Sequence, residues 1–218
     1  MAELRSDEEQ VEAIKNWWKK NGSSLLIGIV AALAIVFGWQ AWQDSQAEKR
    51  SLAAAQFSNL VNSLSENNDE ERLETVGYLA KELQENFENS AYAIYATLIL
   101  AQQQLMDQSD PEAAEASLEW AHARVEQGSA LELIVRSRLA QTQFAAGRHD
   151  DALETLNGAD ETGEFAEIYL ELEGDILLAK GERAAAEEAY RSAREASTSG
   201  QNGLLELKLS DLAAGENL

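Results

Sequence analysis

The apolar residues of this chain are concentrated in one stretch near its start. Residues 22–43 (GSSLLIGIVAALAIVFGWQAWQ) contain no charged side chain, and the middle of this stretch, 25–37, is almost wholly aliphatic. About 20 residues of α-helix, at about 1.5 Å of rise each, span the hydrocarbon core of a bilayer. Four of the five tryptophans lie near its ends, where interfacial anchors are expected: Trp17, Trp18, Trp39 and Trp42. The pattern predicts a transmembrane helix rather than a core helix, because no later segment is apolar enough to enclose it.

The charges beside this stretch predict its orientation. Three lysines at positions 15, 19 and 20 precede it, whereas Asp44 and Glu48 come before the first cations that follow it. Basic residues near a span favour the cytoplasm. We therefore expect a cytoplasmic tail over 1–21, an anchor over 22–43 and a large domain over 44–218 on the opposite side.

A cleaved signal peptide is the alternative to a retained anchor. Ser45-Gln46-Ala47 has the small residues of a cleavage site, and cleavage there would release a soluble repeat domain. However, the apolar stretch is much longer than the roughly 7–15 residues of a signal peptide. The sequence therefore favours a retained anchor.

The tail has the pattern of a short amphipathic helix. Ser6 and Glu9 have the spacing of a capping box, and Val11, Ile14 and Trp18 recur at helical spacing. We expect this helix to lie on the inner membrane face and the chain to turn inward at 21–22. A frayed tail with incidental periodicity is the alternative.

Helical periodicity continues through the rest of the chain, with short polar turns and no strand-like alternation. No Pro or Gly lies between the anchor and Asn67-Asn68, so the anchor helix is expected to run on into the large domain. A second helix is predicted over 69–87 and a third from Ser90 to Met106. Asp110-Pro111 is a strong start signal for a fourth helix, which Gly128 is expected to end.

The later helices repeat with a period of 34 residues. Five pairs of equivalent positions define it: Ala140 and Gly174, Gly147 and Gly181, Ala152 and Ala186, Leu156 and Tyr190, Ala159 and Ala193. A small residue in the first helix lets the second pack close, and Gly makes the turn, as in tetratricopeptide repeats. A looser copy runs over 90–124, with an insertion of about five residues before the next. Residues 203–214 would form a capping helix. We predict an all-α tetratricopeptide-like solenoid.

Composition excludes several functions. The chain has 218 residues and a net charge of −22, of which residues 44–218 contribute −21. Such an acidic domain would repel nucleic acid. Cysteine is absent, and His122 and His149 are the only histidines. We find no catalytic constellation, phosphate-binding loop, metal site or cofactor motif, and we expect a non-enzymatic protein.

Two surfaces are candidates for binding. The first helix of each repeat lines the concave face of such a stack. The register places nine residues there: Tyr95, Leu98, Gln102, Ile134, Ser137, Gln141, Ile168, Glu171 and Asp175. The alternative is that the apolar ones only pack within and between repeats. In the anchor, Ser24, Gly28 and Ala32 form a stripe of small residues that would let another transmembrane helix approach closely.

The chain resembles the YfgM family, ancillary subunits of the bacterial Sec translocon. The resemblance is strongest in Glu8–Lys15 (EEQVEAIK), Trp17-Trp18, Asn21-Gly22 and Gly38-Trp39 with Trp42. Asn89–Ala93 (NSAYA) and 204–212 also fit the family's C-terminal domain. The resemblance covers the whole chain.

This resemblance implies a single-pass protein of the bacterial inner membrane, with its tail in the cytoplasm and its repeats in the periplasm. Similar proteins associate with the Sec translocon and with PpiD, a membrane-anchored periplasmic chaperone, and are thought to assist emerging secreted polypeptides. The resemblance also implies a stress-response link through the Rcs response regulator. A membrane-tethered scaffold for another envelope complex, such as one for cytochrome maturation or cell division, is the alternative.

Overall fold

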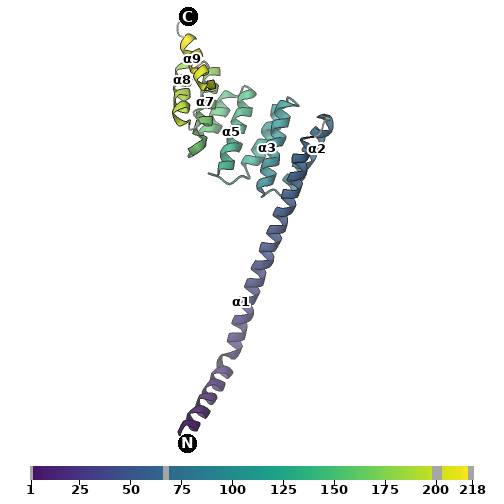
Figure 1. The fold of residues 1–218 in the computed structure, drawn as a ribbon, viewed down its shortest axis with the longest axis vertical. Helices are drawn as coiled ribbons and strands as arrows, with labels where there is room; N and C mark the ends of the chain where they lie inside the picture. The colour runs from purple at the N-terminus through teal and green to yellow at the C-terminus, as the bar shows by residue number, and fades with distance from the viewer. Residues whose placement is uncertain (1, 66–68, 198–202, 216–218) are drawn as a thin grey trace. The chain divides into compact units, whose positions relative to one another are not determined.

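The computed structural model describes residues 2–65, 69–197 and 203–215, and in these ranges the chain is helical, with no strand. The chain divides into two compact units, Met1–Leu52 and Ala53–Leu218 (Figure 1). The predicted all-α fold is confirmed. The expected boundary between anchor and domain, at residue 44, stays a prediction.

One long helix, α1 (Ala2–Ser63), contains the whole predicted anchor and continues into the second unit, as expected. Among the residues described, α1 is the one helix that is long and apolar enough to cross a membrane. The predicted turn at 21–22 is wrong, because α1 continues without a break. The Asn21 side chain donates a hydrogen bond to the Trp17 carbonyl (3.1 Å), and Gly22 lies under the indole of Trp18. Both residues therefore serve the helix rather than interrupt it.

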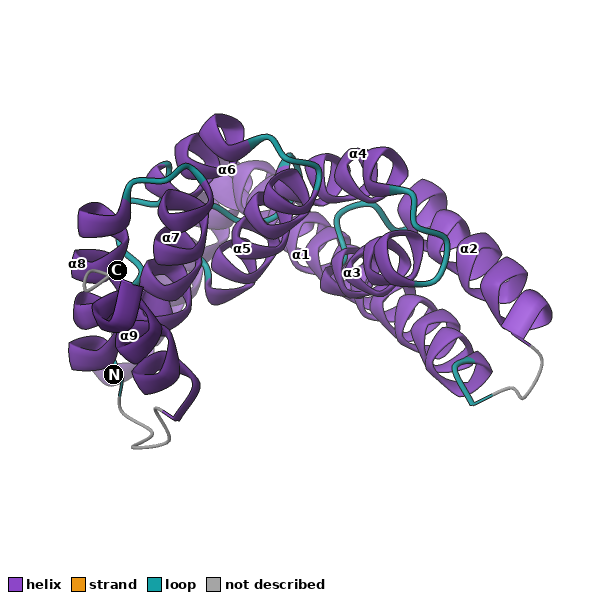
Figure 2. Ribbon diagram, turned by 90° about the horizontal axis from the view of Figure 1, so that it is seen from above, coloured by secondary structure: helices purple, strands orange, loops and turns teal. Residues whose placement is uncertain are grey.

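The second unit is built from antiparallel pairs of helices. A short 3₁₀ turn, η1, precedes the last pair, and a single helix follows that pair. The elements after α1 are α2 (Asp69–Asn86), α3 (Ala91–Met106), α4 (Pro111–His122), α5 (Ala130–Ala145), α6 (His149–Asn157), η1 (Gly163–Phe165), α7 (Ala166–Ala179), α8 (Arg183–Ala196) and α9 (Gly203–Gly215). Within this unit, α3, α5 and α7 line the inner side of an arc, and α4, α6 and α8 lie outside them (Figure 2).

Local sequence explains the starts of α3, α4 and α5. The Ser90 hydroxyl caps α3 by accepting from the Tyr92 N–H, and the Ser129 hydroxyl caps α5 by accepting from the Glu132 N–H. A carboxylate oxygen of Asp110 accepts from the Ala113 N–H at 3.0 Å, and Pro111 follows as the first residue of α4. The start predicted at Asp110-Pro111 is confirmed.

The small and large positions of the repeat meet as predicted. Ala140, Ala152 and Leu156 are buried together between α5 and α6. In the next pair, a Cβ on Gly174 would lie only 2.5 Å from the ring of buried Tyr190. The small residue of the first helix is therefore what allows the second helix to approach. In the looser copy, the equivalent residues Ala101, Ala114 and Leu118 are also buried together.

One detail of the sequence prediction is wrong. Gly128 does not end α4, which stops at His122; Gly128 has φ of +73° in the turn just before the Ser129 cap. It supplies a left-handed turn residue rather than a helix terminator. In the capping helix α9, Leu205 and Leu212 pack against α8, but Leu204 is 62% exposed and does not join them.

Candidate protein-binding groove

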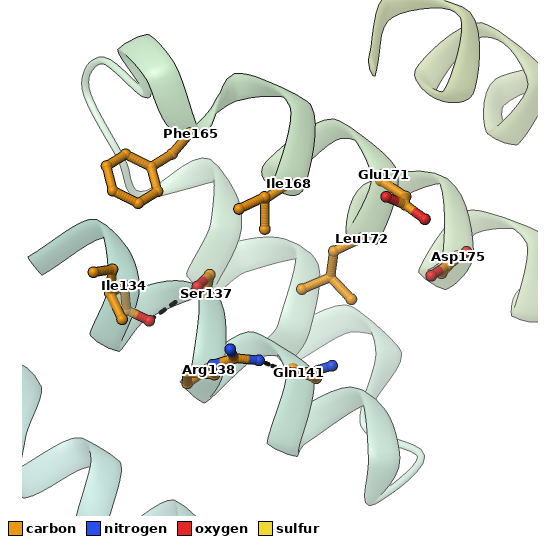
Figure 3. A pocket seen from close by; sticks show the side chains of 9 residues that line it. All are labelled: Ile134, Ser137, Arg138, Gln141, Phe165, Ile168, Glu171, Leu172 and Asp175. Carbon is orange, nitrogen blue, oxygen red and sulfur yellow. Dashed lines mark hydrogen bonds between the residues drawn. The ribbon is translucent and has the colours of Figure 1, made fainter. Parts of the chain in front are cut away.

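Two adjacent pockets lie along the inner face of the second unit. The polar pocket, of about 270 Å³, lies between α5 and α7 and is lined by Ile134, Ser137, Arg138, Gln141, Phe165, Ile168, Glu171, Leu172 and Asp175 (Figure 3). The apolar pocket, of about 740 Å³, lies between α3 and α5 and is lined by Leu98, Ile99, Ala101, Gln102, Leu105, Met106, Leu118, Ile134, Arg138, Gln141 and Ala145. Ile134, Arg138 and Gln141 line both, so the pockets form one continuous groove across α5.

The structure brings eight of the nine expected groove residues into these pockets. The exception is Tyr95, which lines neither one. Its ring centroid lies 6.1 Å from that of Phe57 at the end of α1, and its side chain is half-exposed. Whether any of these residues binds a partner stays a prediction.

The sequence prediction missed the same register position on all three groove helices. The expected residues stand at positions i, i+3 and i+7 of α3, α5 and α7. The structure adds the i+4 residue of each helix, which is Ile99, Arg138 and Leu172. The i+4 residue shares a helix face with residue i, so helical spacing would have identified all three. The structure also adds residues outside this register: Phe165 of η1 in the polar pocket, and Ala101, Leu105, Met106, Leu118 and Ala145 in the apolar pocket.

The two carboxylates of the polar pocket are already paired. Lys208 of α9 donates to Glu171 at 2.7 Å and to Asp175 at 2.7 and 2.9 Å. Burial alone would lower the pKa of Lys208, but the hydrogen bonds to Asp175 and Glu171 outweigh burial and raise that pKa above its ordinary value. The Tyr190 hydroxyl also donates to Asp175 at 2.7 Å. Desolvation, reinforced by this hydrogen bond, raises the pKa of Tyr190.

A buried polar network holds α5 in place beneath the groove. Glu132 is 2% exposed and accepts from Arg136 at 2.5 Å, and Arg136 also donates to the Thr155 carbonyl of α6. From α4, Glu115 accepts from Gln143 and pairs with Arg148. These bonds join α4, α5 and α6, so the groove helix at the centre is fixed to both neighbours.

Each of the two histidines lies beside a side chain of α5. The ring of His149, at the start of α6, lies 5.6 Å from that of Phe144. The Nε2 atom of His122 lies 3.4 Å from a carboxylate oxygen of Glu132, although the geometry is not that of a hydrogen bond. Within the described ranges, His, Asp and Glu do not gather in any group of three that could hold a metal ion.

The stripe in the anchor lies along one exposed side of α1. Ser24, Gly28 and Ala32 follow one another at intervals of a helical turn, and a Cβ on Gly28 would meet no atom within 4 Å. This side of the helix has room for the backbone of another helix.

Comparison with known proteins identifies the family. Residues 15–214 match a family model described as a tetratricopeptide repeat-like domain. The chain is also 32% identical over 212 residues to a protein of Haemophilus influenzae named "Ancillary SecYEG translocon subunit", a match that covers 97% of this chain and 100% of the relative. The chain belongs to that family.

More distant relatives carry the same name. The Escherichia coli relative is 28% identical, with 95% of this chain and 97% of the relative covered. The relative from Neisseria gonorrhoeae is 27% identical, with 97% and 100% covered. The matches include the tail and anchor as well as the repeats, so the family membership expected from the N-terminal residues is confirmed.

Proposed function

We propose that this protein is a non-enzymatic ancillary subunit of the Sec translocon. The observation that carries the proposal is the likeness over nearly the whole chain to relatives named for that role. In this proposal α1 holds the protein in the bacterial inner membrane, with the tail in the cytoplasm and the repeat domain in the periplasm. The lysines before the apolar stretch support this orientation.

The groove is the proposed site for polypeptide partners, namely a PpiD-like membrane-anchored chaperone, emerging secreted polypeptides, or both. An apolar pocket of about 740 Å³ beside a polar one of about 270 Å³ suits a segment that carries both large apolar and polar side chains. Met106 adds a flexible, polarisable side chain at its edge, of the kind that adapts to different partners. In the membrane, the small-residue stripe on α1 is the proposed contact for a partner's transmembrane helix.

Crosslinking in native membranes tests the translocon assignment. The tagged protein is expressed at its natural level, crosslinked, extracted in a mild detergent and analysed with its neighbours by mass spectrometry. Translocon subunits together with a periplasmic folding factor are the expected result. Recovery of a different envelope complex, such as one for cytochrome maturation or division, would leave the fold intact and contradict the proposed function.

A photoreactive residue inside the groove tests the proposed binding face. Replacing Gln102, which is exposed in the apolar pocket, is expected to give crosslinks to the chaperone or to secreted chains. Glu154, exposed on α6 outside the groove, is the matched control and is expected to give few. Equal yields from the two positions would contradict a binding role for the groove.

The absence of cysteine makes the orientation simple to test. A single cysteine replaces either Lys15 in the tail or Glu188 on α8, and intact cells with a permeable outer membrane receive an inner-membrane-impermeant maleimide. Labelling at position 188 but not at 15 is expected. The reverse pattern would contradict the orientation, and loss of the N-terminal peptide from the intact mass would indicate cleavage near Ala47.

A further inference from the structure

Arg138 differs from the other cations of the repeat unit. Residues 53–218 contain eleven lysines and arginines, and within the described ranges nine of them pair with a carboxylate. Arg183 instead donates to the backbone carbonyl of Leu212 at 3.0 Å. Arg138 is exposed and donates to the neutral side chain of Gln141 at 2.8 Å.

This difference is unexpected in so acidic a domain. Acidic side chains outnumber basic ones by 34 to 13 over residues 44–218, so a surface arginine has many potential partners. Among the described residues, none of these carboxylates lies in ion-pair contact with Arg138. Its full charge is therefore available to a bound molecule.

Arg138 lines both pockets of the groove, so its charge can contact a molecule bound there. Among the described residues that line the apolar pocket, Arg138 is the only ionisable one. In the polar pocket both carboxylates already pair with Lys208, which cancels one of their two negative charges. Across both pockets, the guanidinium of Arg138 is the charge that remains unpaired in the described structure.

We infer that Arg138 binds an acidic side chain of the polypeptide segment that occupies the groove. The inference rests on the proposed function. The segment carries large apolar residues that fill the apolar pocket against Leu98 and Leu105, and an Asp or Glu beside them that pairs with the guanidinium. A planar guanidinium suits a carboxylate, because two parallel N–H groups donate to its two oxygens.

The geometry favours an internal acidic residue of the bound segment over the segment's C-terminal carboxylate. Arg138 lies where the two pockets meet, and Ile134 and Gln141 also line both. A segment that fills both pockets must pass Arg138 with chain on either side. The remaining surface of the domain is strongly negative, so the segment carries a single acidic residue rather than an acidic run.

Fluorescent peptides test this inference on the full chain in detergent micelles. The probe is an amidated peptide of about twelve residues with leucines around one central Glu, the other positions being Ser and Asn. Its partner peptide has Gln in place of Glu. The Glu peptide is expected to bind about tenfold more tightly, the effect of one partly exposed charge-assisted pair.

Variants of the protein identify the contact. Arg138→Gln is expected to remove the preference for Glu while leaving binding of the Gln peptide unchanged. Arg138→Glu is expected to reverse the preference in favour of a peptide with central Lys. Arg191→Gln, an equal loss of charge on exposed α8 outside the groove, is the matched control and keeps the preference. Circular dichroism confirms that each variant is folded.

The outcomes separate the inference from the proposed function. Equal binding of the Glu and Gln peptides would overturn the role of Arg138 and leave the groove as a binding site. A gain from a free terminal carboxylate, with none from the central Glu, would overturn the internal position. If neither peptide binds, the groove proposal fails and the inference fails with it.

Discussion

The pairs α5–α6 and α7–α8 share one 34-residue pattern but pack with different chemistry. Ala140 and Leu156 are buried in one cluster between the helices of the first pair, whereas Gly174 lies against the Tyr190 ring in the second. The smaller residue stands opposite the larger one, so the helices remain close in both. The repeat therefore conserves the combined volume at this contact rather than the residue types.

The polar groups of the two pairs also differ. The pair α5–α6 contains a buried ion pair, because Glu132 and Arg136 are both under 10% exposed. In the pair α7–α8, Asp175 lines the groove and accepts hydrogen bonds from Tyr190 of α8 and from Lys208, which connects the pair to the capping helix. These bonds hold α5 to α6 within the first pair, and they hold the second pair to α9 at the end of the stack. The Tyr169 hydroxyl joins the two pairs by donating to the Leu133 carbonyl at 2.8 Å.

The largest expected effect comes from the buried ion pair. Arg136→Met removes the arginine partner of buried Glu132, which costs about 3–5 kcal/mol of the free energy of unfolding. Urea unfolding followed by circular dichroism measures this loss. The double variant Glu132→Leu, Arg136→Met removes both charges and is expected to recover most of it. Arg191→Met breaks an exposed pair on α8 and is expected to cost less than about 1 kcal/mol.

The next effect tests the exchange of volume between the two pairs. Gly174→Ala places a methyl group 2.5 Å from the Tyr190 ring and is expected to cost about 1–3 kcal/mol. Adding Tyr190→Leu recreates the Ala–Leu contact of α5–α6 and should restore part of the loss. Gly77→Ala in α2, where a Cβ meets no atom within 4 Å, is the matched control. It should be neutral or stabilising, as Ala is preferred over Gly in a helix. Equal effects at both glycines would disprove the volume argument.

A smaller effect is expected when only the hydroxyl of Tyr190 is removed. Tyr190→Phe keeps the packing against Gly174 and deletes the hydrogen bond to Asp175, for a loss of about 1 kcal/mol. Tyr78→Phe, at an exposed position of α2, is the control and should leave the urea midpoint unchanged. A loss as large as that from Gly174→Ala would show that the hydroxyl, not the volume, dominates this contact.

The smallest effect concerns alkaline pH. The folded-state pKa values of Tyr190 and Lys208 are raised, so above about pH 10 the unfolded chain releases protons that the folded chain retains. Stability is therefore fully present below pH 10 and falls as pH rises beyond it. Urea midpoints between pH 7 and 11 measure the decline. It should be shallower in Tyr190→Phe and unchanged in Tyr78→Phe.

The sequence alone determined the helices, their pairing and the family. Local signals suffice for these features: Asp110 and Pro111 start α4 by satisfying its first N–H groups, and the 34-residue period places a small residue opposite a large one. The apolar stretch likewise identifies α1 without any knowledge of tertiary contacts. Helical register also brings eight of the nine expected residues to the lining of the two pockets, since residues i, i+3 and i+7 share one face.

Only the tertiary structure decided which charges are paired. Lys208 lies 33 residues from Asp175 in the chain, and Arg148 lies 33 residues from Glu115, so no local pattern relates them. The same holds for Arg138, which looks like any other surface arginine in the sequence. The structure shows that Arg138 has no carboxylate partner among the described residues, whereas most cations of the repeat unit do. Ion pairing depends on distances of a few ångströms, and the fold alone sets these distances.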